Sequence, residues 1–430
     1  MKVIFVQLNE INFDIANAYI KKGYNLNFLK KVLEEGIDTF ENEDYENLEP
    51  WIQWFSIFKG KPFKEHRVFR LGDGLQFPGD NVFSDLTNKL KIKCGAISPM
   101  NISGRNINFD FFIPDPWSNE NIQGNLSLKL INDSIKQGVN DNSGRGLNFV
   151  NKVKLLIGLL INLNLTELKS IFKFYKKIKN LSFRKALFLD YLLVILQRSL
   201  TKKNKTQFTS IFLNAGAHIQ HHYLFNSKVI HKKHNLENPS WYIDKTLDPL
   251  GEALLFYNDI LNSYQKDGYK IILMTGLQQV PYDKINYYYR LSNHKNFLKF
   301  LDIKNKKILP RMTRDFEIIF ENNIDRDKCI DKLDNITDEK GIKIFNEIEI
   351  REKSIFSSLT YNKEIKKSKL FKLGKREFIL SDYVNFVALK NGKHDKKGKL
   401  FISNRDLKKD FYIPIELSQI RDLIFQEICS

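Results

Sequence analysis

Short, fully apolar runs alternate along this chain with longer stretches whose apolar residues recur at helical spacing. Lys2 to Gln7 is such a run, and the segment from Ala16 to Gly36 that follows has helical periodicity and ends at a glycine. Similar runs at Lys91 to Ser98, Thr209 to Leu213 and Tyr269 to Gly276 predict further buried strands. This alternation of strands and helices predicts an α/β fold.

The stretch from about Asn125 to Lys205 differs from the rest of the chain. Its periodicity is helical almost throughout, with few turn residues after Gly146. Beyond Pro310, in contrast, short predicted strands alternate with lysine-rich loops. We therefore expect an α/β core formed by residues 1–124 and 206–430, interrupted by an all-helical insertion at residues 125–205.

Length and composition fit either two domains or one large α/β domain with insertions. The chain has 430 residues, of which 42% are hydrophobic, enough for a sizeable core. Its cysteines, Cys94, Cys329 and Cys429, are too widely spaced to suggest a disulfide framework or a thiolate zinc site. The amino terminus lacks the features of a signal peptide, and the longest apolar stretch, Leu155 to Leu165, is shorter than the about 20 residues that span a bilayer. We expect a soluble, cytoplasmic protein.

A formal net charge of +18 suggests a partner that carries phosphate groups. Much of the excess lies in the runs Lys173 to Lys179, Lys202 to Lys205 and Lys363 to Lys372, and such runs are more often solvated faces and loops. The basic residues are not interleaved with aromatic residues in a known nucleic-acid motif, so we expect no specific nucleic-acid partner. Peripheral contact with an anionic membrane, at its inner surface, stays open as an alternative to a purely cytoplasmic location.

Three of the chain's eight histidines, His218, His221 and His222, fall within the stretch Leu213 to Phe225. Spacings of three and four residues place their rings along one helical face, where an i, i+4 pair can hold one divalent metal. The preceding apolar run predicts that they follow the carboxyl end of a strand, a common place for α/β active sites. Clustered histidines can equally be hydrogen-bonded core groups or the wet edge of a helix.

Four segments, read in chain order, share spacings with one enzyme family. They are the end of the first strand with Glu10, the pair Gly60 and His66 in WFSIFKGKPFKEHRV, the pair His218 and His222, and Gly392, His394 and Gly398 in the pattern G-x-H-x-x-x-G. In these segments the chain resembles the alkaline phosphatase superfamily, especially its type I phosphodiesterase and nucleotide pyrophosphatase branch. The family usually has aspartate where Glu10 and His218 stand.

The resemblance implies a mostly parallel central sheet with helices on both faces, and a cap at residues 125–205. It also implies one divalent ion, zinc or alternatively manganese, held by His218, His222 and His394 with a fourth position open. Expected substrates are phosphoric or sulfuric esters of small molecules or glycans, with a link to surface polysaccharide.

Two departures from the family pattern bear on the chemistry. The family's threonine or serine nucleophile would fall at Pro50, and the neighbouring Glu49 and Trp51 offer no hydroxyl. Its S-D-H-G motif would fall at residues 275–278, TGLQ, which lack both ligands. We therefore expect hydrolysis or transfer by a metal-bound hydroxide, with Glu10 and Glu49 as general base or weak ligands of a second metal. The alternative is an inactive family member that binds a phosphorylated or glycan ligand.

Further side chains are candidates for supporting the ligands or binding substrate. They are His221, Asn214, Trp51, Arg70, Arg290, His294 and Arg311. The arginines could clamp a phosphate or sulfate, although structural ion pairs explain such residues as often. Trp51 could stack on a sugar or base, or pack in the core. The sequence contains no Walker loop, no G-x-G-x-x-G after a strand and no G-x-S-x-G elbow, which disfavours the corresponding chemistries.

Overall fold

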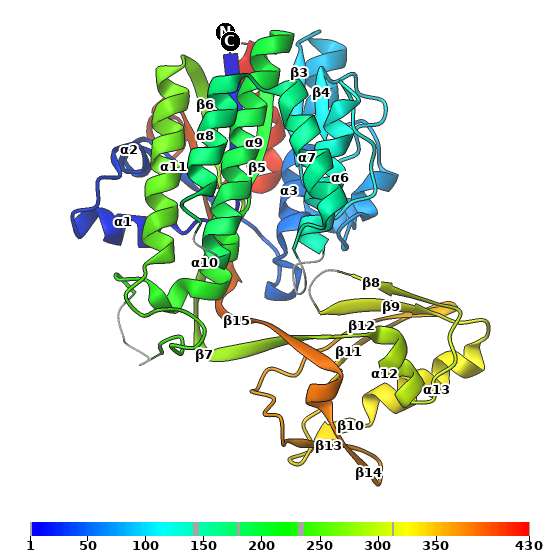
Figure 1. Cartoon of the computed structure of the whole chain (residues 1–430). Coiled ribbons are helices and arrows are strands. Elements are labelled where there is room, and N and C mark those ends of the chain that lie inside the picture. The colour runs from blue at the N-terminus through cyan, green and yellow to red at the C-terminus, as the bar shows by residue number, and fades with distance from the viewer. Residues whose placement is uncertain (1, 141–145, 179–180, 231–235, 312–313, 430) are drawn as a thin grey trace. The chain divides into compact units, whose positions relative to one another are not determined.

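The structure, a computed structural model, describes residues 2–140, 146–178, 181–230, 236–311 and 314–429 (Figure 1). The chain forms two compact units. The first consists of Met1–Val139, Leu147–Asp283 and Asn391–Ser430, and the second of Asn140–Gly146 and Lys284–Lys390. Each unit is described separately below.

An eight-stranded sheet organises the first unit. β1 (Lys2–Leu8) lies in its middle and pairs in parallel with β5 (Phe208–Leu213) on one side and β6 (Tyr269–Met274) on the other. Beyond β5 come β3 (Cys94–Ile97) and β4 (Phe111–Ile113), and beyond β6 come β16 (Lys397–Ile402), β2 (Ile37–Phe40) and β17 (Ile415–Glu416). Among the described pairings, β16 runs antiparallel to both of its neighbours and the others are parallel. The predicted α/β fold with a mostly parallel sheet is confirmed.

Helices cover both faces of this sheet (Figure 1). On one face lie α1 (Phe13–Lys21), α2 (Asn27–Glu35), α9 (Ser182–Asn204), α10 (Ala215–Tyr223) and α11 (Pro249–Lys266). On the other lie α3 (Pro50–Lys59), α5 (Val82–Ser84) and α15 (Ile420–Cys429), and the short helices α4 (Phe63–His66) and α14 (Leu407–Asp410) also belong to the first unit. Alternate residues of β1 enter the two cores, Ile4 and Val6 on one side and Val3 and Phe5 on the other. Covering both faces explains why the central strands β1, β5 and β6 are buried along almost their whole length.

The segment predicted as a helical insertion forms α6 (Ser127–Asn140), α7 (Phe149–Asn162), α8 (Leu165–Tyr175) and α9. Its helices share one apolar core with the central sheet, through residues such as Leu128, Leu159, Ile171 and Leu196. Apart from Asn140–Gly146, the segment is therefore part of the first unit. Among the described residues, no helix is long and apolar enough to cross a membrane.

The second unit has its own apolar core, which includes Phe297, Phe316 and Phe345. Around it stand a four-stranded sheet, a three-stranded sheet and two helices: β8 (Lys307–Pro310), β9 (Asp315–Ile319), β11 (Glu347–Arg351), β12 (Ser354–Ser358), β10 (Ile336–Asp338), β13 (Leu370–Leu373), β14 (Arg376–Ile379), α12 (His294–Phe300) and α13 (Asn323–Asp334). The chain enters and leaves this unit along the paired strands β7 (Gln278–Leu291) and β15 (Val384–Asp395). The sequence analysis left this segment inside the α/β core, because alternating short strands do not reveal which core they join.

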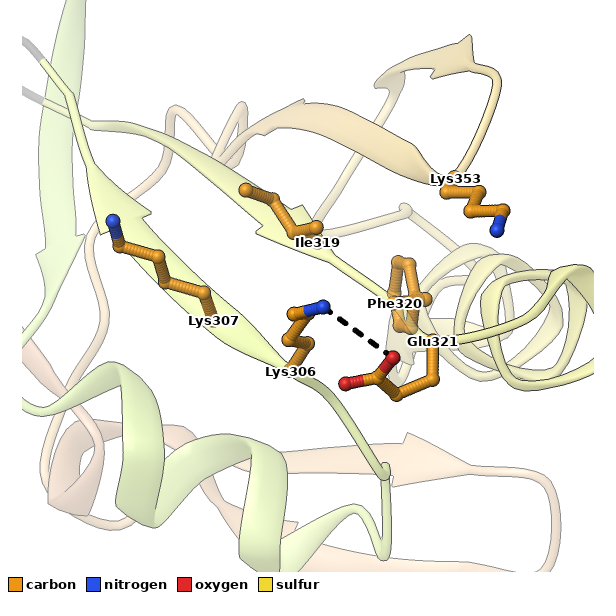
Figure 2. A pocket seen from close by; sticks show the side chains of 6 residues that line it. All are labelled: Lys306, Lys307, Ile319, Phe320, Glu321 and Lys353. Atoms are coloured by element: carbon orange, nitrogen blue, oxygen red, sulfur yellow. Dashed lines mark hydrogen bonds and ion pairs between the residues drawn. The ribbon is translucent and has the colours of Figure 1, made fainter.

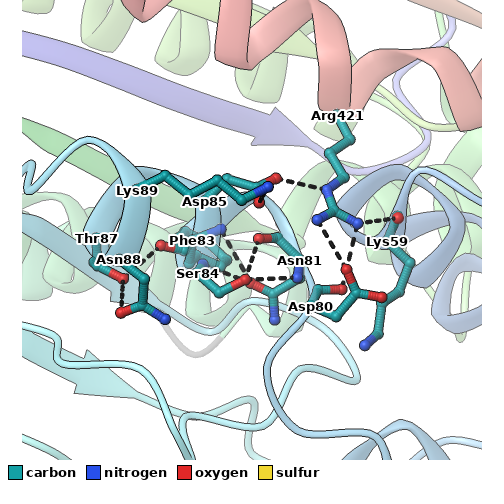
Figure 3. A network of polar contacts seen from close by, with 10 residues as sticks. All are labelled: Lys59, Asp80, Asn81, Phe83, Ser84, Asp85, Thr87, Asn88, Lys89 and Arg421. Carbon is teal, nitrogen blue, oxygen red and sulfur yellow. Dashed lines mark hydrogen bonds and ion pairs between the residues drawn. The ribbon is translucent and has the colours of Figure 1, made fainter.

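Arg421 of α15 joins three segments of the first unit (Figure 3). Its Nε donates to Oδ2 of Asp85 at 2.7 Å, its Nη2 to Oδ1 of Asp80 at 3.0 Å, and its Nη1 to the carbonyl oxygen of Lys59 at 2.7 Å. Lys59 ends α3, and the next residue, Gly60, has a φ of 67° and leaves room for the arginine, since an added Cβ would lie 2.9 Å from Arg421 Cδ. The guanidinium thus fixes α15 against the end of α3.

We expect Arg421→Ala to lower the free energy of unfolding by about 3 kcal/mol at neutral pH, because it leaves the largely buried Asp85 carboxylate without its strongest partner. Burial raises the pKa of Asp85, but Arg421 and Lys89 outweigh it and hold the pKa below 3.8. A lowered pKa stabilises the fold above the pKa of the unfolded chain, and that stability is lost as the pH falls.

The difference between wild type and variant should therefore shrink below about pH 4. Urea unfolding at neutral and acid pH measures it. Arg421→Lys, which keeps the charge but not the fork of donors, should lose less stability than Arg421→Ala. Equal stability of Arg421→Ala and wild type at neutral pH would refute this role.

Candidate metal centre

Glu10 lies at the edge of the sheet where the carboxyl ends of β1, β5 and β6 meet. The N–H of Asn9 donates to the carbonyl oxygen of Leu213 at the end of β5 (3.1 Å), and the N–H of Glu10 donates to that of Thr275, just after β6 (3.0 Å). Glu10 has a left-handed backbone, with φ at 59°, which is uncommon for a residue with a side chain. Bonds to both flanking strand ends hold it in this conformation.

Buried amide side chains fix both the backbone and the carboxylate of Glu10. Gln220 donates to the carbonyl oxygen of Glu10 at 2.7 Å and accepts from the N–H of Asn12 at 3.1 Å. Asn9 donates to Oε1 of the carboxylate at 2.9 Å, and Gln279 donates to Oε2. With Glu10 only 1% exposed, these bonds orient a carboxylate that water reaches hardly at all.

The helix that carries His221 is anchored at its amino terminus by a carboxylate from α9. The side chain of Asp190 accepts from the N–H groups of Asn214 (3.2 Å) and Ala215 (3.0 Å), and from the hydroxyl of Tyr257 (2.7 Å). Asp190 thereby supplies acceptors for two N–H groups at the start of α10, which have no acceptor within the helix. Because this contact fixes the helix, it also fixes the direction in which His221 points.

His221 and His394 converge on one oxygen of Glu10. Their Nε2 atoms lie 3.1 Å and 3.2 Å from Glu10 Oε2, and 3.3 Å from each other. Nδ1 of His221 lies 3.2 Å from the carbonyl oxygen of Gly392, which can only accept, so this contact places a proton on Nδ1 and leaves Nε2 as the ring atom that can serve as a ligand. On the far side of His394, Nδ1 lies 3.7 Å from Oε2 of Glu49.

These three atoms fit the ligand positions of a tetrahedral metal site. In such a site, with bonds of about 2.0–2.1 Å, two ligand atoms lie about 3.3–3.4 Å apart. The observed separations, 3.1, 3.2 and 3.3 Å, are close to this. Glu10, His221 and His394 form the group of potential ligands that the described residues bring together. Two imidazoles and a carboxylate are also the donor set of some catalytic zinc sites, which keep a fourth position open.

The electrostatics of Glu10 favour a cation at this point. Burial by itself raises the pKa of Glu10, but His394 and His221 outweigh it and hold the pKa well below the ordinary 4.5. The carboxylate is therefore ionised at neutral pH. A buried anion beside two imidazole nitrogens is stabilised either by a proton on a ring or by a metal ion between them.

The group differs from the ligand set predicted from spacing, because it contains His221 in place of His218 and His222. The rings of His218 and His222 lie 4.8 Å apart, centre to centre, and burial lowers the pKa of His218 to about 4. Successive helical residues point about 100° apart, so His221 faces a different direction from its neighbour His222. Glu10, predicted as a general base or a weak ligand of a second metal, lies among the potential ligands.

Other predicted residues of the first unit make structural contacts. Asn214 accepts a hydrogen bond from Asn9 at 2.8 Å and so belongs to the network beside the cluster. The indole of Trp51 donates to the carbonyl oxygen of Phe69 at 2.9 Å, and the guanidinium of Arg70 lies 4.7 Å from the centre of the Phe69 ring. These contacts hold the side chains of Trp51 and Arg70 against Phe69 in the first unit.

Arg290, His294 and Arg311 belong to the second unit. The ring of His294 packs edge-on against Phe316, and burial, with the nearby Arg290, lowers its pKa to about 4. Arg311 pairs with Glu317 at 2.6 Å. A role for these side chains in substrate binding stays a prediction.

The start of α3 is the position at which the family's hydroxyl nucleophile would fall. Pro50 is the first residue of the helix, and Glu49 stands before it. His66, which matches a family spacing, accepts from the N–H of Val68 at Nδ1 (3.0 Å), so its Nε2 donates to the hydroxyl of Ser56 (2.9 Å). Burial lowers the pKa of His66 to about 4. A ring with both nitrogens so engaged is a structural group.

The sequence analysis missed the buried groups that orient the cluster, namely Asn9, Asn12, Asp190, Gln220 and Gln279. A signal was present for some of them. Asn9 directly follows the strand β1, Asn12 lies three residues further on, and Gln279 follows the apolar run of β6 after a short turn. Amides at the carboxyl ends of neighbouring strands lie at the same sheet edge.

A separate pocket lies within the second unit (Figure 2). It is lined by Lys306, Lys307, Ile319, Phe320, Glu321 and Lys353. Nζ of Lys306 lies 3.5 Å from the Glu321 carboxylate. None of these lining residues belongs to the Glu10 cluster.

We expect Gly392→Ala to weaken metal binding by about 10–100-fold, the usual effect of disturbing groups that orient ligands. An added Cβ would lie 2.3 Å from Oε1 of Gln279 and 2.8 Å from the carbonyl oxygen of Gln220. The backbone of Gly392 would have to move, and with it the acceptor for His221. Zinc titration with a competing chelator measures the affinity.

Gly138→Ala is the matched control, since the nearest atom to its added Cβ is 3.7 Å away, in Leu147. It lies inside α6 and should leave zinc affinity unchanged while stabilising the fold by up to about 1 kcal/mol. Zinc affinity in Gly392→Ala equal to that of wild type would disprove the proposed coupling.

No family model and no curated protein matches the chain. Solved structures do. The phosphonoacetate hydrolase of Sinorhizobium meliloti is 10% identical, with a TM-score of 0.42 over 98% of this chain and 94% of that one. Alkaline phosphatase PafA is 11% identical (TM-score 0.39, 97% and 94% covered), and human ectonucleotide pyrophosphatase/phosphodiesterase 5 is 10% identical (0.39, 99% and 94%).

Proposed function

We propose that this protein is a metal-dependent hydrolase or transferase that acts on a phosphoric or sulfuric ester, with one divalent ion held by Glu10, His221 and His394. The observation that carries the proposal is the convergence of three ligand atoms within 3.3 Å of one another at the carboxyl edge of the sheet. The donor set suits zinc, with manganese as the alternative. When bound, such an ion polarises a phosphoryl oxygen and lowers the pKa of water to about 7.

The chain's own residues prepare this centre. The proton on Nδ1 of His221 is held at the carbonyl oxygen of Gly392, which keeps Nε2 available as a ligand. Asn9 and Gln279 hold the two oxygens of Glu10 in place. Because these donors are buried and already oriented, little reorganisation accompanies binding.

Glu49 is the proposed general base. Its Oε2 lies 3.7 Å from Nδ1 of His394, and its side chain is 36% exposed, so that it adjoins the cluster and remains accessible to water and substrate. A carboxylate here would take the proton from the attacking water or substrate hydroxyl. This role fits a chain with proline at the position of the usual hydroxyl nucleophile. The first turn of α3, directly after Glu49, favours an anionic substrate group.

The proposed substrates are phosphorylated or sulfated small molecules or glycans, including precursors of a surface polysaccharide, encountered in the cytoplasm or at the inner face of a membrane. Asn214, beside the cluster, is the proposed contact to such a ligand. This assignment of substrate and location rests on the resemblance to the superfamily.

Elemental analysis of purified protein should find about one metal ion per chain, and His221→Ala and His394→Ala should lose it, because each removes one of three ligands. His222→Ala is the matched control, one residue further along the same helix, and should keep the metal. Loss of metal in His222→Ala but not in His221→Ala would replace the proposed ligand set with the one predicted from spacing. No metal in the wild-type protein would refute both.

Glu49→Gln should lower kcat by about 10²–10⁴-fold on a panel of aryl phosphate monoesters, diesters and sulfates, with the metal content unchanged. Glu46→Gln, an exposed glutamate in the same segment, should have wild-type activity. If the metal-loaded wild type hydrolyses none of the panel and transfers no group to an added alcohol, the inactive, ligand-binding alternative is favoured.

A further inference from the structure

The outward side of α7 is apolar, which is unusual for a helix on a protein surface. Large hydrophobic side chains between 39% and 79% exposed occur at seven of its positions: Phe149, Val150, Val153, Leu156, Ile157, Leu160 and Ile161. At 100° per residue these positions fall within an arc of about 140°. They form one continuous stripe, which we call the α7 stripe. Contiguous exposed apolar surface of this kind marks interaction sites.

The opposite side of α7 is firmly attached to α6. An added Cβ at Gly158 would lie 2.6 Å from Ile131, so the two helices approach each other closely there. Asn162 donates to the hydroxyl of Ser127 at 2.7 Å, and Leu159 is buried. The helix therefore cannot rotate to bury its stripe without breaking these contacts.

The helix α8 also exposes large apolar side chains, here interspersed with positive charge. Leu165, Phe172 and Tyr175 are 74%, 59% and 59% exposed, and the exposed Lys169 and Lys176 lie between and beside them. Leu165, Lys169, Phe172 and Lys176 follow one another at intervals of four, three and four residues, so they share one helical face. Nζ of Lys176 lies 4.6 Å from the centre of the Phe172 ring. Apolar and basic groups thus alternate along α8.

Charge in this region is strongly one-sided. Between Leu147 and Ile178 the sequence has six lysines and a single acidic residue, Glu167. The carboxylate of Glu167 already accepts from the N–H of Asn164 (2.8 Å) and the hydroxyl of Ser199 (3.2 Å). The lysines therefore meet little compensating negative charge within their own segment, and the nearby α6 contributes Asp133, 3.8 Å from Lys154.

We propose that α7 and α8 form a docking surface for an anionic lipid membrane, with the α7 stripe in the headgroup and acyl boundary and the lysines on the lipid phosphates. Exposed apolar side chains accompanied by lysines are the composition of helices that lie in the membrane interface. At fourteen residues, α7 is about 21 Å long, too short to cross the roughly 30 Å hydrocarbon core. It lies along the surface instead.

Charge complementarity selects this occupant over a second copy of the chain. A symmetric contact through the same patch would bring two sets of lysines together, on chains that each carry a net charge of +18. Anionic lipids offer the opposite charge, and each lysine near such a surface contributes favourably. This inference is independent of the metal centre.

The test measures co-sedimentation of the full chain with vesicles of phosphatidylcholine alone and with about 30% phosphatidylglycerol added. Wild type should bind the anionic vesicles at least about tenfold better, and the preference should fall as salt is raised. The double variant Leu156→Asp, Leu160→Asp should lose binding by at least about tenfold, because it places two carboxylates in the stripe. Lys169→Gln with Lys176→Gln should remove the lipid preference.

The matched control is Tyr412→Asp with Ile413→Asp, two exposed apolar residues elsewhere in the first unit, 94% and 76% exposed. It should bind vesicles as wild type does. All variants change exposed side chains, and thermal unfolding should match wild type. The proposal is overturned if wild type ignores anionic vesicles, if the stripe variant binds like the control, or if light scattering shows a dimer that the stripe variant abolishes without any vesicle binding.

Discussion

The buried carboxylate of Glu10 is the constraint on which the first unit is organised. An ionised group that is 1% exposed costs several kcal/mol unless charges or hydrogen bonds compensate for the lost water. Four elements supply that compensation: the turn after β1, the helix α10, and the strands β7 and β15, which contribute Asn9, His221, Gln279 and His394. A fold that brings such distant segments to one anion creates a place for a cation.

The potential ligands are positioned by groups that are not themselves potential ligands. Asp190 fixes the start of α10, the carbonyl oxygen of Gly392 fixes the tautomer of His221, and Gln220 fixes the left-handed backbone of Glu10. Each is a long-range contact between elements far apart in sequence. Ligands positioned by rigid elements in this way need little rearrangement to bind.

The helical segment packs into the core of the first unit on one side and is exposed to solvent on the other. α9 lies against the sheet, with Leu196 fully buried, whereas α7 presents its stripe to solvent while Gly158 and Leu159 hold it to the body of the first unit. Its basic, apolar composition alone could describe a loose cap or a core helix. An apolar helix face can form a docking surface only if it points to solvent, and otherwise it packs in the core. The contacts on the opposite side of the helix decide where that face points.

The sequence by itself determined the α/β fold and, through its family motifs, the mostly parallel sheet, because buried strands and the residues that end them leave a local pattern. It also singled out Glu10 and His394 as candidates, and the structure brings these two side chains within 3.2 Å of each other. It could not choose among His218, His221 and His222. His218 and His222 are four residues apart, and so are Ala217 and His221, so the members of each pair share a helical face. The two faces point about 100° apart, and spacing alone does not show which of them is turned toward the site. Contacts with α9 and β15 decide that rotation. Tertiary structure likewise decided that Lys284–Lys390 has its own core, since which apolar residues pack together depends on contacts between distant segments rather than on local periodicity.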